Sequence, residues 1–416
     1  NPWGGILLML VISISVLPIV YFWTKKLFGE KAAIVTLFLF AVSSEAAAAA
    51  TYTWNPHPMW LLIVIYIFTF YSTIYKSDKF NVILWPVIGL MFHFQTALGV
   101  FILLASLIYV FLFERKIVLN RNFIIGISLF LLTFLPQIVF DIRHDFLMSR
   151  SALSLLAGSE RGLFVSGEKS GYLELVKNHF DSLYGNFRSA FINDGFAGYL
   201  PNLFIAVILS SILLIMKKTN VFLKKESEFI LIIVKLLLII ILLTFAYPFP
   251  LRYWFLTGFQ SFYLIILGLI LSKFLNNRLG KTGFIAIFAV LIFYSLQRIN
   301  VLYFRPPNDG GAEKIKGKLS AIDYVYKDSK GKPFGLLVFT PAVYTDAYDY
   351  LIWWHGKEKY DYIPHKEKKG IFYLLMETDR SKPWSNIGWR ETVIKTGDIL
   401  ETTTLPTGLI IQKRSM

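Results

Sequence analysis

Between Trp3 and Asn300, long apolar runs alternate with short polar gaps. Ten runs are predicted to be membrane-spanning helices: Trp3–Trp23, Ala32–Thr51, Met59–Tyr75, Asn81–Gln95, Ala97–Phe113, Phe123–Phe140, Tyr199–Met216, Phe229–Tyr247, Trp254–Leu271 and Gly283–Asn300. Most have the roughly 17–25 residues that cross about 30 Å of hydrocarbon at 1.5 Å per residue. Asn81–Gln95 is short, and we expect it to form a bent or partly inserted pair with Ala97–Phe113.

Basic residues gather in every second gap, which predicts the orientation of the chain. One set of gaps holds Lys25, Lys26, Lys31, Lys76, Lys79, Arg115, Lys116, Arg121, Lys217, Lys218, Lys224, Lys225, Lys273, Arg278 and Lys281. The short gaps of the other set hold only Arg252. Because loops rich in Lys and Arg stay in the cytoplasm, the first residue, the loop 141–198 and the tail after Asn300 are predicted to lie outside.

The tail differs in character from the rest of the chain. After a turn-forming stretch at 305–311, helical spacing in Ala312–Asp328 and Tyr344–His355 alternates with strand-like runs at Phe334–Thr340, Ile371–Met376 and Leu409–Gln412. The predicted fold class is therefore an all-α polytopic membrane bundle of about ten transmembrane helices over residues 1–303, including the external loop 141–198. A small C-terminal α/β domain follows over residues 304–416, on the extracytoplasmic side of a cell (plasma or inner) membrane.

Composition excludes several classes of function. The formal net charge of +15 lies mostly in the predicted cytoplasmic gaps, where it faces anionic lipid, so no nucleic-acid partner is expected. The chain has no cysteine, which excludes disulfides, a thiolate nucleophile and a Cys-ligated zinc. Gly280-Lys281-Thr282 lacks the first glycine of a phosphate-binding loop, and no cofactor or metal is indicated.

The loop 141–198 is too long to be a bare connector. Within Tyr172–Phe180, the residues Leu173, Val176 and Phe180 share one helical face, and Glu174, Lys177 and Asn178 share another. Such a helix can lie flat at the membrane interface and cover an active-site cavity. The alternative is a surface helix packed on the tail domain.

Polar side chains collect at the external ends of the predicted spans, and this convergence suggests a site. They are Asn55 and His57 in one loop, His93 and Gln95 at the end of a short span, Asp141, Arg143 and Asp145 after another, and Arg252 with Tyr253 before a third. Arg252 is the strongest candidate for binding phosphate, since the guanidinium fork matches phosphate geometry, and Arg143 is the second. Glu45 lies inside a span, where a carboxylate needs a partner or a wet cavity.

Several of these candidates have a structural alternative. Tyr253 could be an interfacial anchor, and His93 a hydrogen-bonded packing residue. Arg143 with Asp141 or Asp145 could form an ordinary surface pair. Glu45 could hold neighbouring helices together instead of facing a cavity.

The order of these features resembles the integral-membrane glycosyltransferases of the GT-C class. The resemblance is to the glycosyltransferase family 39-like group, with protein O-mannosyltransferases and lipid A aminoarabinose transferases. It rests on Lys25-Lys26-Leu27-Phe28-Gly29 before an Ala-rich span, Tyr52-Thr53-Trp54-Asn55-Pro56, Phe92-His93-Phe94-Gln95-Thr96-Ala97, Leu135-Pro136 leading to residues 140–146, and Arg252-Tyr253. It covers roughly residues 1–300, and the tail resembles the external domain that some members append.

The resemblance implies inverting transfer of a sugar from a polyprenyl-phosphate donor to a lipid, glycan or protein acceptor on the external face. Members use an acidic residue of the first external loop as base, and no position of this chain matches it. We therefore expect that base to lie before Asn1 in an N-terminally truncated sequence, with Asp141 and Asp145 as fallback acids or metal ligands. Arg252 and Tyr253, with Arg143, Asn55, His57, His93, Gln95 and Glu45, are the expected substrate-binding residues.

Other functions remain open at this stage. A transporter, a flippase or a polysaccharide polymerase or ligase that handles lipid-linked glycans would also be polytopic. A transporter would place ionisable groups near the membrane midplane and often contain repeats, whereas this chain gathers its polar residues at one edge. A non-catalytic scaffold would not need that polar edge.

Overall fold

The structure is a computed structural model that describes residues 1–118, 120–156, 171–192, 222–276, 278–304, 311–341, 344–379 and 382–416. These residues form two compact units. The first, the helical unit, comprises residues 3–296, and the second, the C-terminal unit, comprises residues 297–416 with Asn1 and Pro2. The proposed domain boundary at 303/304 remains a prediction, and the predicted span Tyr199–Met216 lies outside the described residues.

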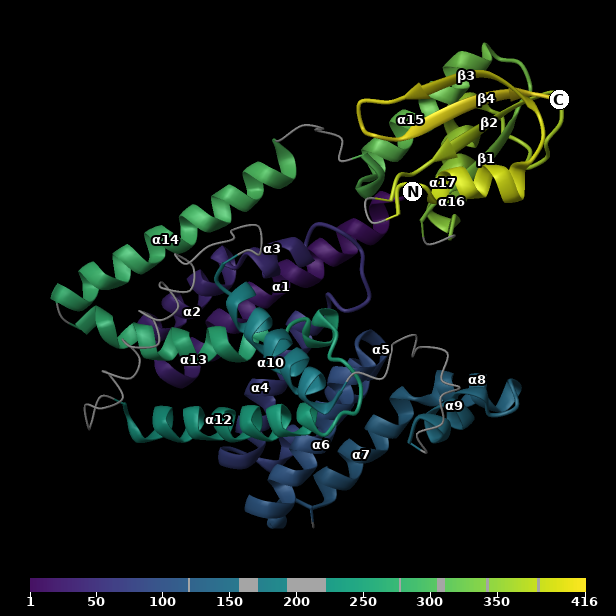
Figure 1. The fold of residues 1–416 in the computed structure, drawn as a ribbon. Helices are drawn as coiled ribbons and strands as arrows, with labels where there is room; N and C mark the ends of the chain where they lie inside the picture. The colour runs from purple at the N-terminus through teal and green to yellow at the C-terminus, as the bar shows by residue number, and fades with distance from the viewer. Residues whose placement is uncertain are drawn as a thin grey trace. The chain divides into compact units, whose positions relative to one another are not determined.

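The helical unit is built from helices in chain order (Figure 1). They are α1 (Trp3–Phe28), α2 (Glu30–Val42), α3 (Ser44–Ala49), α4 (Met59–Tyr75), α5 (Asn81–Phe94), α6 (Thr96–Phe113), α7 (Arg121–Thr133), α8 (Leu135–Arg143), α9 (Leu147–Leu156), α10 (Tyr172–Ser189), α12 (Lys224–Phe245), α13 (Gln260–Ser272) and α14 (Arg278–Tyr303), which continues into the C-terminal unit. A short 3-10 turn, η3 (Tyr253–Leu256), precedes α13.

Four described helices are long and apolar enough to cross a membrane. They are Trp3–Phe28, Thr96–Phe113, Lys224–Phe245 and the part Gly280–Asn300 of α14. The bent pair α7 and α8 adds a fifth if it is one span, while Met59–Tyr75 and Gln260–Asn276 are apolar but shorter. A helical membrane protein is thus supported, whereas the number of about ten spans remains a prediction.

Three predicted spans are wrong as continuous helices. Trp254–Leu271 begins in the 3-10 turn η3 and is α-helical only from Gln260, after Gly258 with φ +83°. Ala32–Thr51 breaks at Ser43, whose extended backbone (φ −66°, ψ 116°) ends α2 and whose hydroxyl accepts from the Ala46 N–H to begin α3. Phe123–Phe140 bends by 44° between α7 and α8. Pro136, in the first turn of α8, explains that bend because it lacks the N–H that would continue the helix.

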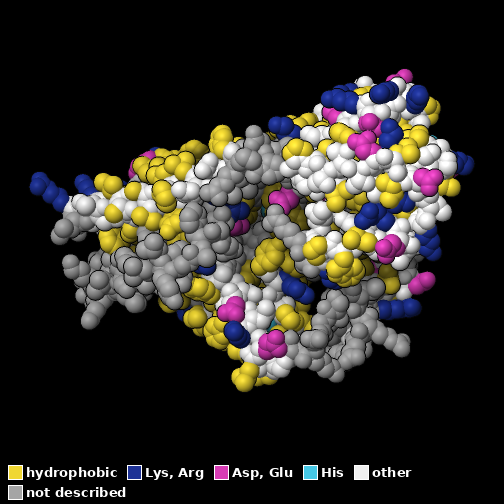
Figure 2. All heavy atoms as spheres, turned by 45° about the horizontal axis from the view of Figure 1, so that its top comes forward, with side chains coloured by type: hydrophobic (Ala, Val, Ile, Leu, Met, Phe, Trp, Pro, Cys, Tyr) yellow, Lys and Arg dark blue, Asp and Glu magenta, His cyan; other side chains and the backbone are white. Residues whose placement is uncertain are grey.

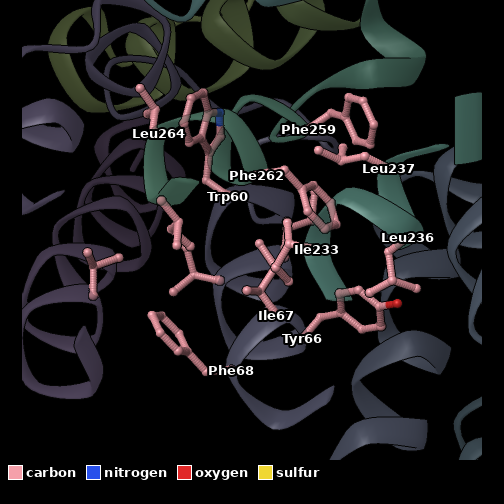
Figure 3. Packing of buried hydrophobic residues seen from close by; sticks show 14 of the residues in the cluster. Trp60, Tyr66, Ile67, Phe68, Ile233, Leu236, Leu237, Phe259, Phe262 and Leu264 are labelled. Carbon is pink, nitrogen blue, oxygen red and sulfur yellow. The ribbon is translucent and has the colours of Figure 1, made fainter. Parts of the chain in front are cut away.

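The core of the helical unit surrounds α4. This helix is apolar on all sides and almost wholly buried, as expected for a central helix. Figure 3 shows Trp60, Tyr66 and Phe68 of α4 packed with residues of α12 and of the chain entering α13, among them Ile233, Leu236, Leu237, Phe259 and Phe262. Two polar groups inside this core satisfy each other, since the Tyr66 hydroxyl and the Ser106 Oγ lie 2.8 Å apart.

The outer faces of the long helices expose apolar side chains. Examples are Val11 of α1, Leu242 of α12 and Ile285 of α14, each about two-thirds exposed. On the face seen in Figure 2, hydrophobic side chains dominate the described surface of the helical unit, whereas charged side chains are scattered over the C-terminal unit. Exposed apolar area of this extent is unfavourable in water and is suited to a lipid environment.

The C-terminal unit contains a four-stranded mixed sheet in the order β1-β2-β4-β3. Its strands are β1 (Gly335–Phe339), β2 (Ile371–Met376), β3 (Asp398–Thr404) and β4 (Ile410–Ser415), of which β1 and β2 are parallel and the others antiparallel. Its helices are α15 (Ile315–Ser329), α16 (Asp346–His355) and α17 (Ser385–Trp389). The predicted segments coincide with α15, α16, β1, β2 and β4, and β3 was missed.

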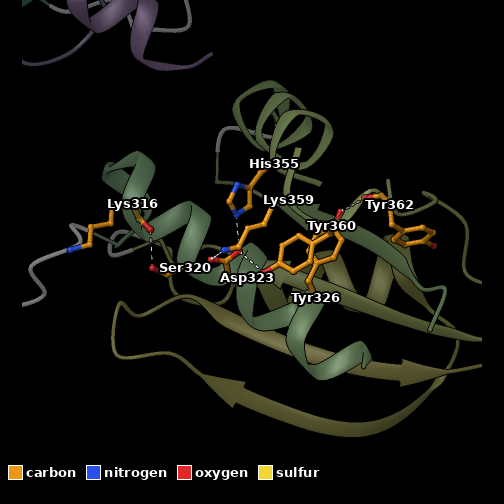
Figure 4. A network of polar contacts seen from close by, with 8 residues as sticks. All are labelled: Lys316, Ser320, Asp323, Tyr326, His355, Lys359, Tyr360 and Tyr362. Atoms are coloured by element: carbon orange, nitrogen blue, oxygen red, sulfur yellow. Dashed lines mark hydrogen bonds and ion pairs between the residues drawn. The ribbon is translucent and has the colours of Figure 1, made fainter. Parts of the chain in front are cut away.

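A polar network ties α15 to the end of α16 (Figure 4). The Asp323 carboxylate accepts hydrogen bonds of 2.7 Å from His355 Nε2, 2.8 Å from Lys359 Nζ and 2.8 Å from the Tyr360 hydroxyl. Burial raises the pKa of Asp323, but the hydrogen bonds from these three donors outweigh it and hold the pKa below its usual value. The network therefore stabilises the charged carboxylate.

Candidate functional site

Three segments of the helical unit, far apart in the sequence, meet around one hollow of about 340 Å³. Its lining residues are Trp54, Asn55, Pro56, Gln95, Tyr253 and Trp254, and we call it the aromatic hollow. They come from the turn before α4, the junction of α5 with α6, and η3. A volume of this size falls in the range of small-ligand sites.

The first wall of the aromatic hollow is the turn that leads into α4. Pro56 and Pro58 suit this position, because the first N–H groups of a helix have no intrahelical acceptor and proline loses nothing there. The Asn55 Nδ2 donates to the Phe94 carbonyl at 3.0 Å. That carbonyl is in the last turn of α5, where such groups lack helical partners, so Asn55 joins this turn to α5.

The second wall is the junction at Gln95. Its backbone (φ −151°, ψ 88°) interrupts the helix between α5 and α6. The side-chain Nε2 donates to the Trp254 carbonyl at 2.7 Å, which joins this junction to η3. Gln95 itself is buried and Trp254 is half-buried, so the hydrogen bond is partly shielded from water.

The third wall is η3, which presents Arg252 beside the aromatic hollow. The Arg252 Cζ lies 5.8 Å from the centroid of the Trp254 ring. Arg252 and Tyr253 are exposed, and no carboxylate in the described part of the chain forms an ion pair with Arg252. A cation held over an aromatic wall and left without an anion is suited to bind an anionic group.

The chain that follows Arg252 and η3 is fixed by its close packing against the start of α4 at Gly258. Gly258 has φ +83°, and a Cβ there would lie 2.8 Å from the Met59 carbonyl carbon and 2.9 Å from the Trp60 nitrogen. Only glycine allows this contact between the chain after η3 and the start of α4. The two walls that carry Arg252 and Asn55 are thereby held together.

The structure brings together only part of the predicted site. Asn55, Gln95 and Tyr253 line the aromatic hollow, and Arg252 adjoins it. His57 is close by in the chain but buried; its Nδ1 lies 2.9 Å from the Tyr52 carbonyl, and its ring packs edge-on against Tyr52. Burial lowers the pKa of His57, which favours the neutral ring.

His93 is bound elsewhere. Its Nε2 donates to the Thr133 carbonyl at 2.8 Å, and its Nδ1 lies 2.9 Å from the Gln137 Nε2, from which it accepts. Both partners flank the bend between α7 and α8, where helical hydrogen bonds are lost. The contacts are those of the packing alternative, and the predicted role in substrate binding is not tested by them.

Asp141 is engaged at the start of α9. Its carboxylate accepts from the Met148 N–H at 2.6 Å, the Ser149 N–H at 3.2 Å and the Ser149 hydroxyl at 2.5 Å. This is the role of a helix N-cap. Arg143 and Asp145 are exposed, and Asp145 adopts φ 52° in the turn between α8 and α9.

Glu45 lies in the first turn of α3, half-buried. Neither it nor Arg143, Asp141 or Asp145 lines the aromatic hollow. Among the described residues, no group of three or more His, Asp or Glu side chains is placed to hold a metal ion.

Comparison with solved structures finds proteins of similar fold. The chain is similar in fold to ArnT. The structure of ArnT from Cupriavidus metallidurans bound to undecaprenyl phosphate matches with a TM-score of 0.56 and 11% identity, over 99% of this chain and 84% of that one. ArnT in the apo state matches with a TM-score of 0.52 and 10% identity, over 99% and 83%. At this identity the likeness shows the fold alone, and it supports the GT-C-like fold that the motifs predict.

Sequence comparisons add no relative: no family model and no curated protein matches the chain.

Two features of the site escaped the sequence analysis. Trp254 contributes both its ring and its carbonyl, although only its neighbours Arg252 and Tyr253 were singled out. The polar face of α10 was predicted at Glu174, Lys177 and Asn178, and it was not followed beyond Phe180. Ser182 and Asn186 follow Asn178 at intervals of four residues, and this spacing could have indicated a polar helix face that binds a neighbouring segment.

Proposed function

We propose that this protein is a membrane glycosyltransferase that takes a sugar from a polyprenyl-phosphate-linked donor and transfers it, with inversion, to an acceptor on the extracytoplasmic face. The observation that carries the proposal is the fold likeness to ArnT bound to undecaprenyl phosphate. It is joined by the position of Arg252 at the aromatic hollow, where no carboxylate of the described residues forms an ion pair with it. The likeness to ArnT supports the class of lipid, and the aromatic hollow is our proposed binding site for its phosphate.

The residues suit a lipid-phosphate donor. Arg252 would bind the phosphate and stabilise the charge that develops on it as the sugar leaves. The Trp54 and Trp254 rings offer apolar faces to the sugar, and the exposed Tyr253 hydroxyl can donate to its oxygens. The residues lining the aromatic hollow include no carboxylate, so we assign it donor binding and not proton transfer.

Lipid binding tests this assignment directly. Undecaprenyl phosphate and undecaprenol, which lacks the phosphate, would be added to the purified full chain in nanodiscs, and binding would be measured by native mass spectrometry. We expect Arg252→Ala to weaken undecaprenyl phosphate binding tenfold or more and Arg252→Lys to weaken it less. Arg121→Ala, which removes an exposed arginine elsewhere, should bind like the wild type.

The contrary results are clear. Equal binding of the lipid by the wild type and Arg252→Ala would remove Arg252 from the site. No preference for undecaprenyl phosphate over undecaprenol in the wild type would refute the proposed donor class.

Orientation needs its own experiment, and the cysteine-free sequence makes one simple. A single cysteine at Tyr253→Cys should react with a membrane-impermeant maleimide in intact cells. One at Lys31→Cys should react only after the membrane is opened. The opposite pattern would place the aromatic hollow in the cytoplasm and refute transfer on the external face.

A further inference from the structure

Helix α10 binds the backbone of the segment that contains Arg252. We call residues 249–256 the Arg252 segment. Four α10 side chains form hydrogen bonds with its main chain. Two bind Leu251: Asn178 Oδ1 accepts from its N–H at 2.7 Å, and Ser182 Oγ donates to its carbonyl at 2.8 Å. His179 Nε2 donates to the Phe249 carbonyl at 2.9 Å, and Asn186 Nδ2 donates to the Leu256 carbonyl at 2.9 Å. These positions recur on one face of the helix, turn after turn.

The Arg252 segment needs these partners. Pro248 and Pro250 have no N–H, which prevents a regular hydrogen-bonded ladder there. Leu251, next to Arg252, is only 1% exposed, and both of its main-chain groups bond to α10. Because buried main-chain groups without partners are costly, the α10 side chains determine where this segment lies.

The polarity of α10 is the reverse of a helix on a water-exposed surface. Its polar residues His179 and Asn186 are buried, whereas Leu173 is 81% and Phe180 60% exposed. Helix α10 contacts α12, α13 and η3 (Figure 1), and beside the core residue Leu183 its inward face carries polar side chains that bind the main chain of a neighbouring segment.

We propose that Asn178, His179, Ser182 and Asn186 are positioning residues that hold Arg252 in the orientation that binds the donor phosphate. They act through the backbone on either side of Arg252 and touch no substrate themselves. This inference rests on the proposed function for the phosphate, but the placement of the segment by α10 does not.

The first experiment follows the segment without any ligand. A spin label on Tyr253→Cys, in the full cysteine-free chain, reports the mobility of η3 by electron paramagnetic resonance. Asn178→Ala and Ser182→Ala should each increase its mobility. Ser182→Thr keeps the hydroxyl and should restore the original spectrum, and Asp181→Ala, which changes an exposed residue of the same helix, should not alter it.

The second experiment measures undecaprenyl phosphate binding in nanodiscs, with Tyr253 intact. Each α10 variant should lower the affinity about three- to tenfold, as expected for the loss of one buried hydrogen bond. In an Arg252→Ala background the same changes should have almost no further effect. A role in stability alone would lower binding to the same extent in both backgrounds.

The outcomes separate the two proposals. An immobile label in both Asn178→Ala and Ser182→Ala overturns the inference, whatever the lipid does. A mobile label with unchanged lipid affinity, or with effects that add to Arg252→Ala, overturns the link to phosphate binding. If the wild type does not bind undecaprenyl phosphate, the proposed function and that link both fail, and the label still decides whether α10 positions the segment.

Discussion

The side chain of Gln95 donates a hydrogen bond to the main-chain carbonyl of Trp254 at 2.7 Å, across 159 residues of sequence. This bond joins the α5–α6 junction to η3 and closes one side of the aromatic hollow. Together with the bond from Asn55 to the Phe94 carbonyl, it makes one structure from three segments. The shape of the site therefore depends on two side-chain amides.

Gln95→Leu should loosen the site without removing a charged group. The variant removes one hydrogen bond to the Trp254 carbonyl, which still accepts from the Thr257 hydroxyl at 3.0 Å, so the expected cost is about 0.5–1.5 kcal/mol of the free energy of unfolding. We expect a lower melting temperature and about tenfold weaker undecaprenyl phosphate binding. Thr96→Ala is the control, because its hydroxyl bonds to the Phe92 carbonyl across the same α5–α6 junction and does not join that junction to η3. Unaltered lipid binding in Gln95→Leu would show that the bond does not shape the site.

Asp141→Ala should affect stability more than chemistry. Its carboxylate caps α9, and loss of such a cap costs about 0.5–2 kcal/mol. We expect a lower melting temperature and unchanged glycan transfer per folded molecule, with Asp141→Asn intermediate. Asp145→Asn should change neither quantity, because Asp145 is exposed and asparagine tolerates its φ of 52° as well as aspartate does. Lost transfer at an unchanged melting temperature would make Asp141 the catalytic carboxylate after all.

The Asp323 network should make the C-terminal unit sensitive to acid. Since the folded-state pKa of Asp323 is below its unfolded value of about 3.9, its contribution is full above that pH and is lost as the pH falls through the folded pKa. Asp323→Asn should lower stability by about 1–2 kcal/mol at pH 7 and by much less near pH 3. Calorimetry of the full chain from pH 3 to 8 measures this, with the exposed Asp361→Asn as control. A deficit independent of pH would mean that the charge of Asp323 does not matter.

Sequence analysis could predict the apolar helices and much of the C-terminal unit, because periodicity records which faces are buried. It missed β3, an almost wholly exposed edge strand with the polar sequence Asp-Ile-Leu-Glu-Thr-Thr-Thr. It also could not foresee the breaks at Ser43 and Phe134, where local capping and a proline override an apolar run.

The candidate site was predictable in composition more than in geometry. Asn55, Gln95, Tyr253 and Arg252 were singled out because they fall at the same end of their predicted spans, and the fold brings these four together. The same argument also selected His93 and Asp141, whose side chains bind the α7–α8 bend and the start of α9. A position at a helix end does not reveal the direction of a side chain, and in both cases a main-chain group of another helix is a partner.

Gly258 provides a direct test of whether the contact between the chain after η3 and the start of α4 positions the site. Its φ of +83° is unfavourable for any other residue. An added Cβ would lie 2.8 Å from the main chain at the start of α4, and backbone atoms cannot move aside as the end of a flexible side chain can. Gly258→Ala should therefore shift η3, at a cost of about 1–3 kcal/mol, and weaken undecaprenyl phosphate binding more than tenfold. The matched control is Gly283→Ala in α14, where a Cβ meets nothing within 4 Å and alanine favours the helix. Melting temperature and lipid affinity are measured side by side for both variants. If Gly258→Ala behaves like Gly283→Ala, the placement of the Arg252 segment does not depend on the contact between Gly258 and α4.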